Sequence, residues 1–266
     1  MNKLKIFCVT DVSSKLLENL SLNLVGVGKK KFSKKYISVK KGINIQKKEK
    51  YYSELTFHYW FWKNKLKKYD KKTWIGFSQK RRFWTKNKSK ITSFEKLKSN
   101  LLIEAPPEWK SYNSVICKPI SVKKPKKIKL IKRGWKNLIL DPQIMFEEKK
   151  QNIELHFDMF HGFGFLKKAI SVMSHKDRNE FSNYVKSNNK FNANIMYISK
   201  KDILDKWFND LFSWLTECEK IFGFKNLFGY DNQRIYAFLA ERYASFWFKK
   251  YSKPIAWHWT FFDITK

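Results

Sequence analysis

Residues 73–84 read TWIGFSQKRRFW, a short apolar run that ends in the polar and charged residues Gln79, Lys80, Arg81 and Arg82. Two of the chain's six arginines stand here side by side, although the chain has fifty lysines. Arginine presents a planar fork of donors that can hold a phosphate or a carboxylate with two hydrogen bonds, which lysine cannot do. The adjacent pair makes this segment the first candidate for an active site.

The sequence before this segment predicts how its charged end is placed. In residues 51–62 the apolar residues recur at helical spacing, and the lysine-rich run 63–72 ends that helix in solvent. Residues 73–78 then have the composition of a buried strand. Gln79 to Arg82 are therefore expected at the carboxyl end of a strand, the edge where open α/β sheets bind ligands.

The two ends of the chain extend the α/β pattern. Residues 4–9 predict a strand that ends at Thr10 and Asp11, followed by a helix-like segment 16–22 and a second short strand at 24–28. Residues 202–222 carry a continuous apolar stripe and predict a long helix. A further helix is expected to start at Asp231, a good N-cap, with Arg242 on its buried face, where an unpaired charge would be costly.

Between these regions, residues 99–142 are rich in proline and lysine and are expected to form a long, basic, irregular surface excursion. Apolar patterning resumes on both sides of it. We therefore predict one α/β domain over residues 1–266, with a mixed sheet flanked by helices and a helical C-terminal third.

Composition bounds the class of protein. The net charge of +33 and the pI near 10 are typical of chains that meet nucleic acid or an anionic membrane, yet the lysine, asparagine and isoleucine bias is also what an AT-rich genome produces. The three cysteines are far apart, which supports neither a disulfide framework nor a zinc ribbon. The apolar run at the N-terminus is too short for a signal peptide, so a cytoplasmic protein is expected.

Several motifs together resemble a bacterial family of capsular and exopolysaccharide glycosyltransferases, long catalogued as a domain of unknown function. They are the start at 5–10, Gly42-Ile43-Asn44-Ile45, Tyr52-Ser53-Glu54-Leu55-Thr56, Trp62-Lys63-Asn64, the segment 76–82, His161, residues 194–197 and Phe238-Leu239-Ala240-Glu241-Arg242. The chain departs from the family where Gln79-Lys80 replaces a His-Tyr pair and where Asp11 replaces a histidine. An altered or inactive relative is therefore one alternative.

The resemblance implies a nucleotide-sugar-dependent transferase of GT-A type, with a Rossmann-like fold and hexosyltransferase activity. The chain contains no Asp-x-Asp motif, which many such enzymes use to hold a divalent metal against the donor diphosphate. We expect Lys80, Arg81 and Arg82 to neutralise the leaving diphosphate without a metal or other cofactor. The remaining expected donor contacts are Thr10, Asp11, Glu54 and Tyr52, of which Tyr52 also suits the core.

Catalytic and acceptor roles are predicted further along the chain. His156, Asp158 and His161 have residue types that bind metals, but three ligands without a fourth are a weak signal. We predict His161 as general base or acceptor contact, with Asp158 as an alternative base and Glu241 as a third catalytic candidate. Asn194 and Arg242 are expected to bind the acceptor or to have a structural role. Residues 162–164 are expected to form a turn, and residues 257–259 to pack in the core.

The basic runs 29–41 and 118–136 leave two further hypotheses open. They are expected to hold a transferase peripherally at the anionic inner face of the cell membrane, where lipid-linked acceptors reside. Alternatively, they track a nucleic-acid backbone in a basic protein without enzymatic activity. No zinc-finger spacing or aromatic RNA-binding signature supports the second hypothesis.

Overall fold

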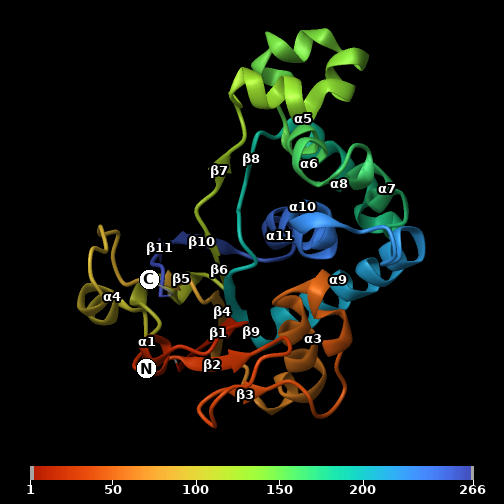
Figure 1. Ribbon diagram of the computed structural model, residues 1–266. Coiled ribbons are helices and arrows are strands. Elements are labelled where there is room, and N and C mark those ends of the chain that lie inside the picture. The colour runs from red at the N-terminus through yellow and green to blue at the C-terminus, as the bar shows by residue number, and fades with distance from the viewer. Residues whose placement is uncertain (1–2, 265–266) are drawn as a thin grey trace. The chain divides into compact units, whose positions relative to one another are not determined.

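The computed structural model describes residues 3–264, whose contacts cluster into two compact units (Figure 1). Unit 1 comprises residues 1–118, 194–209 and 247–266, and unit 2 comprises residues 119–193 and 210–246. The chain passes from one unit to the other within the helices α9 (Lys201–Phe222) and α11 (Ile235–Tyr251). The single domain expected over residues 1–266 stays a prediction.

Unit 1 is built on a mixed β-sheet. Its strand order is β10 (Pro254–Trp257), β6 (Ser114–Cys117), β9 (Tyr197–Lys200), β4 (Trp74–Gln79), β1 (Leu4–Thr10), β2 (Asn23–Gly26) and β3 (Ile37–Ser38). Strands β4, β1, β2 and β3 are parallel, β6 and β10 are parallel, and β9 runs antiparallel between the two groups. Strand β5 (Arg82–Trp84) pairs antiparallel with β4 and with β11 (Trp259–Phe261).

Short helices surround this sheet. They are α1 (Lys15–Glu18), η1 (Gln46–Lys48), α2 (Glu49–Tyr52), α3 (Leu55–Asn64), η2 (Leu66–Lys68), α4 (Phe94–Asn100) and η3 (Pro107–Ser111), together with the part of α9 and α11 that belongs to unit 1. One face of the sheet is covered by an aromatic cluster, in which Phe7 of β1 and Phe77 of β4 meet Phe57 and Phe61 of α3 with ring centroids 4.9–6.2 Å apart. The rings bury large apolar areas and fix α3 on the sheet.

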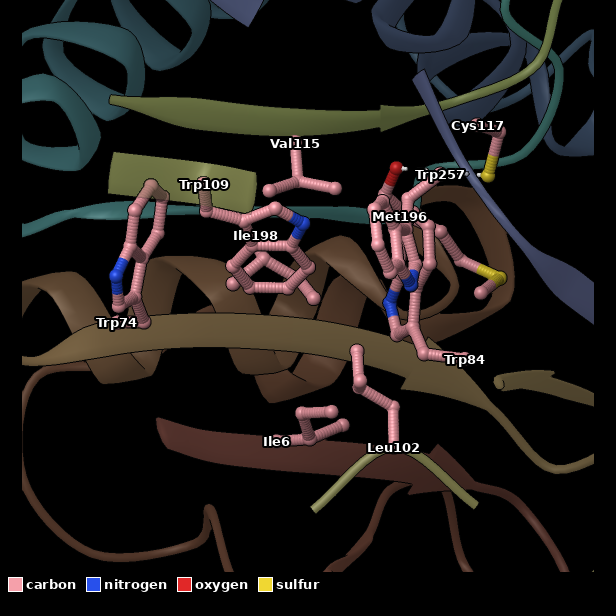
Figure 2. Close-up of a cluster of buried hydrophobic side chains, with 10 residues drawn as sticks. All are labelled: Ile6, Trp74, Trp84, Leu102, Trp109, Val115, Cys117, Met196, Ile198 and Trp257. Carbon is pink, nitrogen blue, oxygen red and sulfur yellow. Dashed lines mark hydrogen bonds between the residues drawn. The ribbon is translucent and has the colours of Figure 1, made fainter. Parts of the chain in front are cut away.

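The opposite face carries a second core cluster (Figure 2). Because side chains alternate along a strand, Ile6 and Trp74 point to this face while Phe7 and Phe77 point to the other. Trp74 and Trp257 both pack edge-on against Trp109, with ring centroids 5.1 and 5.4 Å away. Trp257 also donates a hydrogen bond to the carbonyl of Thr85, which confirms the expected core position of Trp257.

Unit 2 is mainly helical. Its elements are β7 (Ile120–Ser121), α5 (Lys127–Leu140), η4 (Pro142–Met145), η5 (Glu148–Lys150), α6 (Ile153–His161), α7 (Phe165–Ser171), α8 (His175–Ser187), β8 (Lys190–Phe191) and α10 (Gly229–Gln233), with the adjoining parts of α9 and α11. Strands β7 and β8 form a separate antiparallel pair. Among the described residues no helix is long and apolar enough to cross a membrane.

The α/β prediction and the helical C-terminal part are confirmed, as are the strands around 4–9, 24–28 and 73–78, the helix 202–222 and the turn at Gly162 and Gly164, which both have positive φ. The prediction that residues 99–142 form an irregular excursion is wrong, because this segment contains strand β6 of the main sheet and the 14-residue helix α5. Its prolines lie outside these two elements and mark their limits.

Three local predictions are also wrong. The helix expected over 51–62 is broken at Ser53, which has φ 52° and ψ −132°. The helix-like segment 16–22 keeps only the four-residue α1. Asp231 lies inside α10 and does not cap α11, which begins at Ile235. His156, Asp158 and His161 all lie on helix α6.

Gly76 provides a test of the packing in the tryptophan cluster. A Cβ atom at this position would lie 2.7 Å from Cγ1 of Ile198, closer than real Cβ atoms approach, and a tight 3.3 Å from Cγ1 of Ile6. We expect Gly76→Ala to lower the free energy of unfolding by about 1–3 kcal/mol, as overpacked cores do. Urea denaturation measures this change. Ser13→Ala, at an exposed position, is the control and should stay within about 0.5 kcal/mol of the parent protein.

Candidate functional site

Three parallel strands of unit 1 end at the same edge of the sheet. In the register of the sheet, Thr10 of β1 lies beside Gly26 of β2, and Val9 lies beside Gln79 of β4. The amide of Lys80 donates to the carbonyl of Val9 at 3.1 Å, and the amide of Val27 donates to that of Thr10 at 2.9 Å. Pairing thus continues just past the strand ends, which fixes the residues that follow each strand.

The charged side chains at this edge are arranged in two pairs, each with one cation and one carboxylate. The Lys80 ammonium forms an ion pair with Asp11. Gln79 donates its amide N–H to Glu54 and accepts a 2.9 Å hydrogen bond from Arg82 on its amide oxygen. An amide with both ends occupied has a single allowed orientation, so Gln79 holds Glu54 and Arg82 on either side of it. The structure therefore brings together four of the predicted donor-site residues, Asp11, Glu54, Lys80 and Arg82.

The backbone before Glu54 is in an unusual conformation. Ser53 has a positive φ, which a residue other than glycine rarely adopts and which costs of the order of 1–3 kcal/mol. The Ser53 carbonyl accepts hydrogen bonds from the amide and hydroxyl of Thr56, and its amide donates to the Glu49 carbonyl at 2.7 Å. This bend separates α2 from α3 and directs Glu54 toward Gln79. Tyr52, just before it, is buried.

Arg81 and Arg82 differ from Lys80 in their partners. Within residues 3–264, neither arginine forms an ion pair with a carboxylate. The Arg81 guanidinium lies 5.9 Å from the centre of the Phe261 ring, and its carbonyl accepts a hydrogen bond from the amide of Phe262 at 3.0 Å. Both arginines are half-buried. They are thus held in place by the protein while their charge is left for another anion.

A pocket of about 420 Å³ opens at the same edge, over the ends of β2 and β3. The chain after β2 forms most of its wall. Its lining residues are Gly26, Gly28, Lys30, Lys31, Phe32, Ser33, Lys34, Tyr36, Ile37, Ser38 and Lys40. The Tyr36 hydroxyl anchors this loop by hydrogen bonds to the amide and carbonyl of Ser14.

Sequence reasoning treated this loop as a basic run and missed that it encloses a pocket. The signal in the sequence was the placement of Phe32 and Tyr36 among the lysines. Gly26 leaves room for one of them, because a Cβ atom there would lie 2.5 Å from the Phe32 ring. The pocket is lined by four lysines and by the aromatic residues Phe32 and Tyr36. This lining has the chemistry expected for a negatively charged ligand with a planar part.

The remaining predicted site residues lie in unit 2, apart from Asn194. Arg242 of α11 is fully buried and forms an ion pair with Glu241. Its Nη2 donates to Nδ1 of His156 at 3.1 Å and to Nε2 of His161 at 3.3 Å. The guanidinium also lies 4.3 Å from the centre of the Phe191 ring. The partner that a buried guanidinium requires is therefore supplied by one carboxylate and two imidazoles.

Both histidines of this network are held in the neutral form. Nδ1 of His161 lies 3.1 Å from the Asp231 carbonyl and donates to it, which leaves Nε2 as the acceptor facing Arg242. Burial, and then the charge of Arg242, lowers the pKa of His161 to about 2 and that of His156 to about 3. With both ring nitrogens bonded, His161 has a structural position in this network. Its role as a base stays a prediction.

Asp158 is held by two hydrogen bonds, and Asn194 has an unusual backbone conformation. Asp158 accepts hydrogen bonds from the Asn137 side chain at 2.8 Å and from the amide of Gly164 at 3.0 Å, and burial raises its pKa. Asn194 precedes β9 in unit 1 and has φ 70°, a left-handed conformation that asparagine tolerates. Their predicted catalytic and acceptor roles also remain predictions.

The side chains at the strand ends do not form a suitable set of ligands for a divalent metal. Hard cations such as Mg²⁺ and Mn²⁺ take carboxylate and carbonyl oxygens, but this edge presents Lys80, Arg81 and Arg82, and its two carboxylates already hold Lys80 and Gln79. Among the residues that the structure describes, no group of three or more His, Cys, Asp or Glu side chains is arranged to hold a metal ion. We therefore derive no step through a metal.

A family model described as "Domain of unknown function (DUF4422)" matches residues 5–253. The chain belongs to this family. The solved apo structure of WbbM, a bifunctional glycosyltransferase, has a similar fold, with a TM-score of 0.71 and 21% sequence identity. The match covers 98% of this chain and 45% of that one, so the chain spans less than half the length of WbbM. The search of curated proteins gave no match.

The neutral histidines of unit 2 predict how stability depends on pH. Above about pH 7.5 the unfolded chain and the folded protein both carry them neutral. As the pH falls below 6.5 the unfolded chain takes up protons, whereas the folded protein, with depressed pKa values, does not, so stability decreases. Between pH 7.5 and 5.0 we expect each histidine to remove about 2 kcal/mol.

Urea denaturation of the parent protein and of His156→Asn at both pH values measures this effect. The variant should lose less stability between the two pH values than the parent, whatever its stability at pH 7.5. His175→Asn, at an exposed position, should behave like the parent protein. An equal pH dependence in the parent and in His156→Asn would show that His156 is not held neutral.

Proposed function

We propose that this chain is a glycosyltransferase that moves a sugar, of hexosyl type, from a nucleotide-sugar donor to a saccharide or lipid-linked saccharide acceptor in surface polysaccharide synthesis. The observation that supports this best is the edge of the sheet in unit 1. Within the described residues 3–264, Arg81 and Arg82 follow β4 without a carboxylate partner, and a pocket lined by four lysines lies at the ends of β2 and β3 in the same sheet. The fold shared with the WbbM structure makes glycosyl transfer the chemistry that suits such an edge.

In this proposal the donor diphosphate lies against Arg81 and Arg82. When the bond between the sugar and the diphosphate breaks, negative charge develops on the leaving oxygen. Fixed guanidinium groups stabilise that charge without reorganising, which is the most effective form of electrostatic catalysis. Asp11 and Glu54 would orient Lys80 and, through Gln79, Arg82. Transfer would then need no divalent metal.

The lysine-lined pocket is proposed to hold the nucleoside part of the donor, with Thr10 at its border with the diphosphate site. Thr10 is buried, and its hydroxyl donates to the Val12 carbonyl at 2.6 Å, so it shapes the loop after β1. Tyr52 would support Glu54 from the core. The acceptor and base roles of Asp158, His161, Glu241, Asn194 and Arg242 remain hypotheses. The proposed place of action is the cytoplasmic face of the cell membrane.

The first test is binding of UDP, GDP, CDP and dTDP, measured by calorimetry and thermal unfolding in moderate salt. One nucleotide at a hundred times its dissociation constant should add about 2.7 kcal/mol of stability. Arg81→Ala should weaken its binding about 10- to 100-fold, the value of a lost charge-assisted hydrogen bond. Arg234→Ala in unit 2 is the matched control and should bind like the parent protein. EDTA should change neither binding nor transfer.

Two outcomes would contradict the proposal. If no nucleotide binds and single-stranded DNA or RNA binds with a steep salt dependence, the chain is a nucleic-acid-binding protein. If a nucleotide binds but the matching nucleotide-sugar is neither hydrolysed nor transferred to any saccharide, the chain is an inactive relative. A strict requirement for manganese would contradict only the metal-independent mechanism.

The pocket has a separate prediction. Lys31→Ala combined with Lys34→Ala should weaken nucleotide binding several-fold and should reduce its dependence on salt, because exposed lysines act on an anion through screened charge. Lys88→Ala with Lys90→Ala, which removes the same charge from an exposed loop elsewhere in unit 1, is the control. Equal affinities of the two double variants would exclude the pocket as the nucleotide site.

A further inference from the structure

Helix α5 of unit 2 packs on its neighbours with only a narrow face. Leu130 and Gly134 are its buried residues, and they contact Met159 of α6. Helix α5, with η4 after it, packs against α6 within unit 2 (Figure 1). Ten of the 14 residues of α5 are exposed.

An apolar stripe runs along the exposed part of α5. Ile128, Ile131, Trp135 and Ile139 follow each other at spacings of three and four residues, which places them on one face of a helix. Their exposed fractions are 68, 53, 51 and 70%. Leu140 and Phe146, just beyond the stripe, are exposed by 74 and 81%. Single exposed apolar residues are ordinary, but a contiguous stripe marks an interaction surface.

A basic stripe lies directly beside the apolar one. Lys129, Lys132, Arg133 and Lys136 are spaced to fall on the adjoining face, and α5 contains five cations and no acidic residue. Lys136 lies 5.5 Å from the Trp135 ring centre and 5.7 Å from that of Phe163, a further exposed aromatic residue. Arg133 is partly engaged, because it forms a 3.1 Å ion pair with Asp231.

We propose that α5 docks unit 2 on an anionic lipid bilayer, with the isoleucines and Trp135 in the interfacial region and the lysines against the lipid phosphates. An exposed apolar face with a tryptophan, bordered by lysines and arginine, is the pattern of helices that lie in the membrane interface. Each lysine near an anionic leaflet strengthens binding about fivefold. This inference deepens the proposed function by naming the surface at which a lipid-linked acceptor would be met.

The charge of α5 favours a bilayer over the other partners. A second copy of the chain would bring two basic stripes, and two chains of +33, against each other. A nucleic acid would use the lysines but would leave four apolar side chains without a partner. An anionic bilayer satisfies both stripes, since lipid phosphates pair with the lysines while the acyl region takes up the isoleucines.

Co-sedimentation of the full chain with vesicles tests this proposal. Binding should be strong to vesicles of phosphatidylcholine with 30% phosphatidylglycerol and weak to phosphatidylcholine alone. Ile131→Glu combined with Trp135→Glu, and separately Lys129→Glu combined with Lys132→Glu, should each lower the partition coefficient at least tenfold. The altered side chains are exposed, so both double variants should fold, which circular dichroism checks.

Matched controls separate this site from the general charge of the chain. Lys88→Glu with Lys90→Glu makes the same change of charge in unit 1, and Ile43→Glu places a carboxylate at an exposed isoleucine there. Both should bind vesicles within about twofold of the parent. Brominated acyl chains should quench the fluorescence of the parent more than that of Trp135→Phe, which shows insertion of this ring.

The inference would be overturned by equal vesicle binding of the α5 variants and their controls, by no vesicle binding of the parent, or by a concentration-dependent dimer that only the α5 variants abolish. Loss of RNA binding in place of vesicle binding would also contradict it. Nucleotide affinity, measured on the same proteins, separates the two proposals. If the parent protein binds nucleotide but no vesicles, only the docking proposal is refuted. If it binds vesicles but no nucleotide, only the transferase proposal is refuted.

Discussion

Parallel pairing of β1 with β4 is the constraint on which the candidate site depends. The two strands are far apart in the sequence, and their register places Thr10 and Asp11 beside Gln79 and Lys80. A shift of the register by one residue would turn Phe7 away from α3 and move it to the opposite face of the sheet. The aromatic cluster on one face and the tryptophan cluster on the other therefore fix the register, and the register fixes the charged edge.

A shortage of carboxylates determines which cations at that edge stay available. The chain has 56 lysines and arginines against 23 acidic residues, so most cations have no acidic partner and lie in solvent. At the strand ends the two carboxylates are used selectively. Asp11 pairs with Lys80, and Glu54 reaches Arg82 only through the neutral amide of Gln79. This arrangement positions the arginines without neutralising them, which suits the binding of a doubly charged diphosphate.

Sequence patterns predicted the helices and strands whose apolar pattern is visible within the element itself. The short apolar runs of β1 and β4 and the long apolar stripe of α9 were sufficient for these, and the position of Gln79 to Arg82 after a strand followed from them. The pocket after β2 was missed because it depends on Phe32 folding over Gly26, a contact that no periodicity reveals. Strand β6 and helix α5 were missed because Pro106, Pro119 and Pro125 and the lysines around α5 resemble a loop when their tertiary partners are unknown. The network around Arg242 was only half predicted, since burial required partners but did not identify them.

The bridging side chain in unit 1 is an amide, whereas the bridging side chains in unit 2 are imidazoles, so the two respond differently to pH. A histidine in place of Gln79 would change its hydrogen bonds to a carboxylate and a guanidinium on protonation. The amide in this chain has no proton to lose or gain, so Gln79 itself does not respond to pH. In unit 2 the bridges to Arg242 are imidazoles that can accept only while neutral. Acidification therefore acts on the folding of unit 2 through His156 and His161, and leaves the Gln79 amide of unit 1 unchanged.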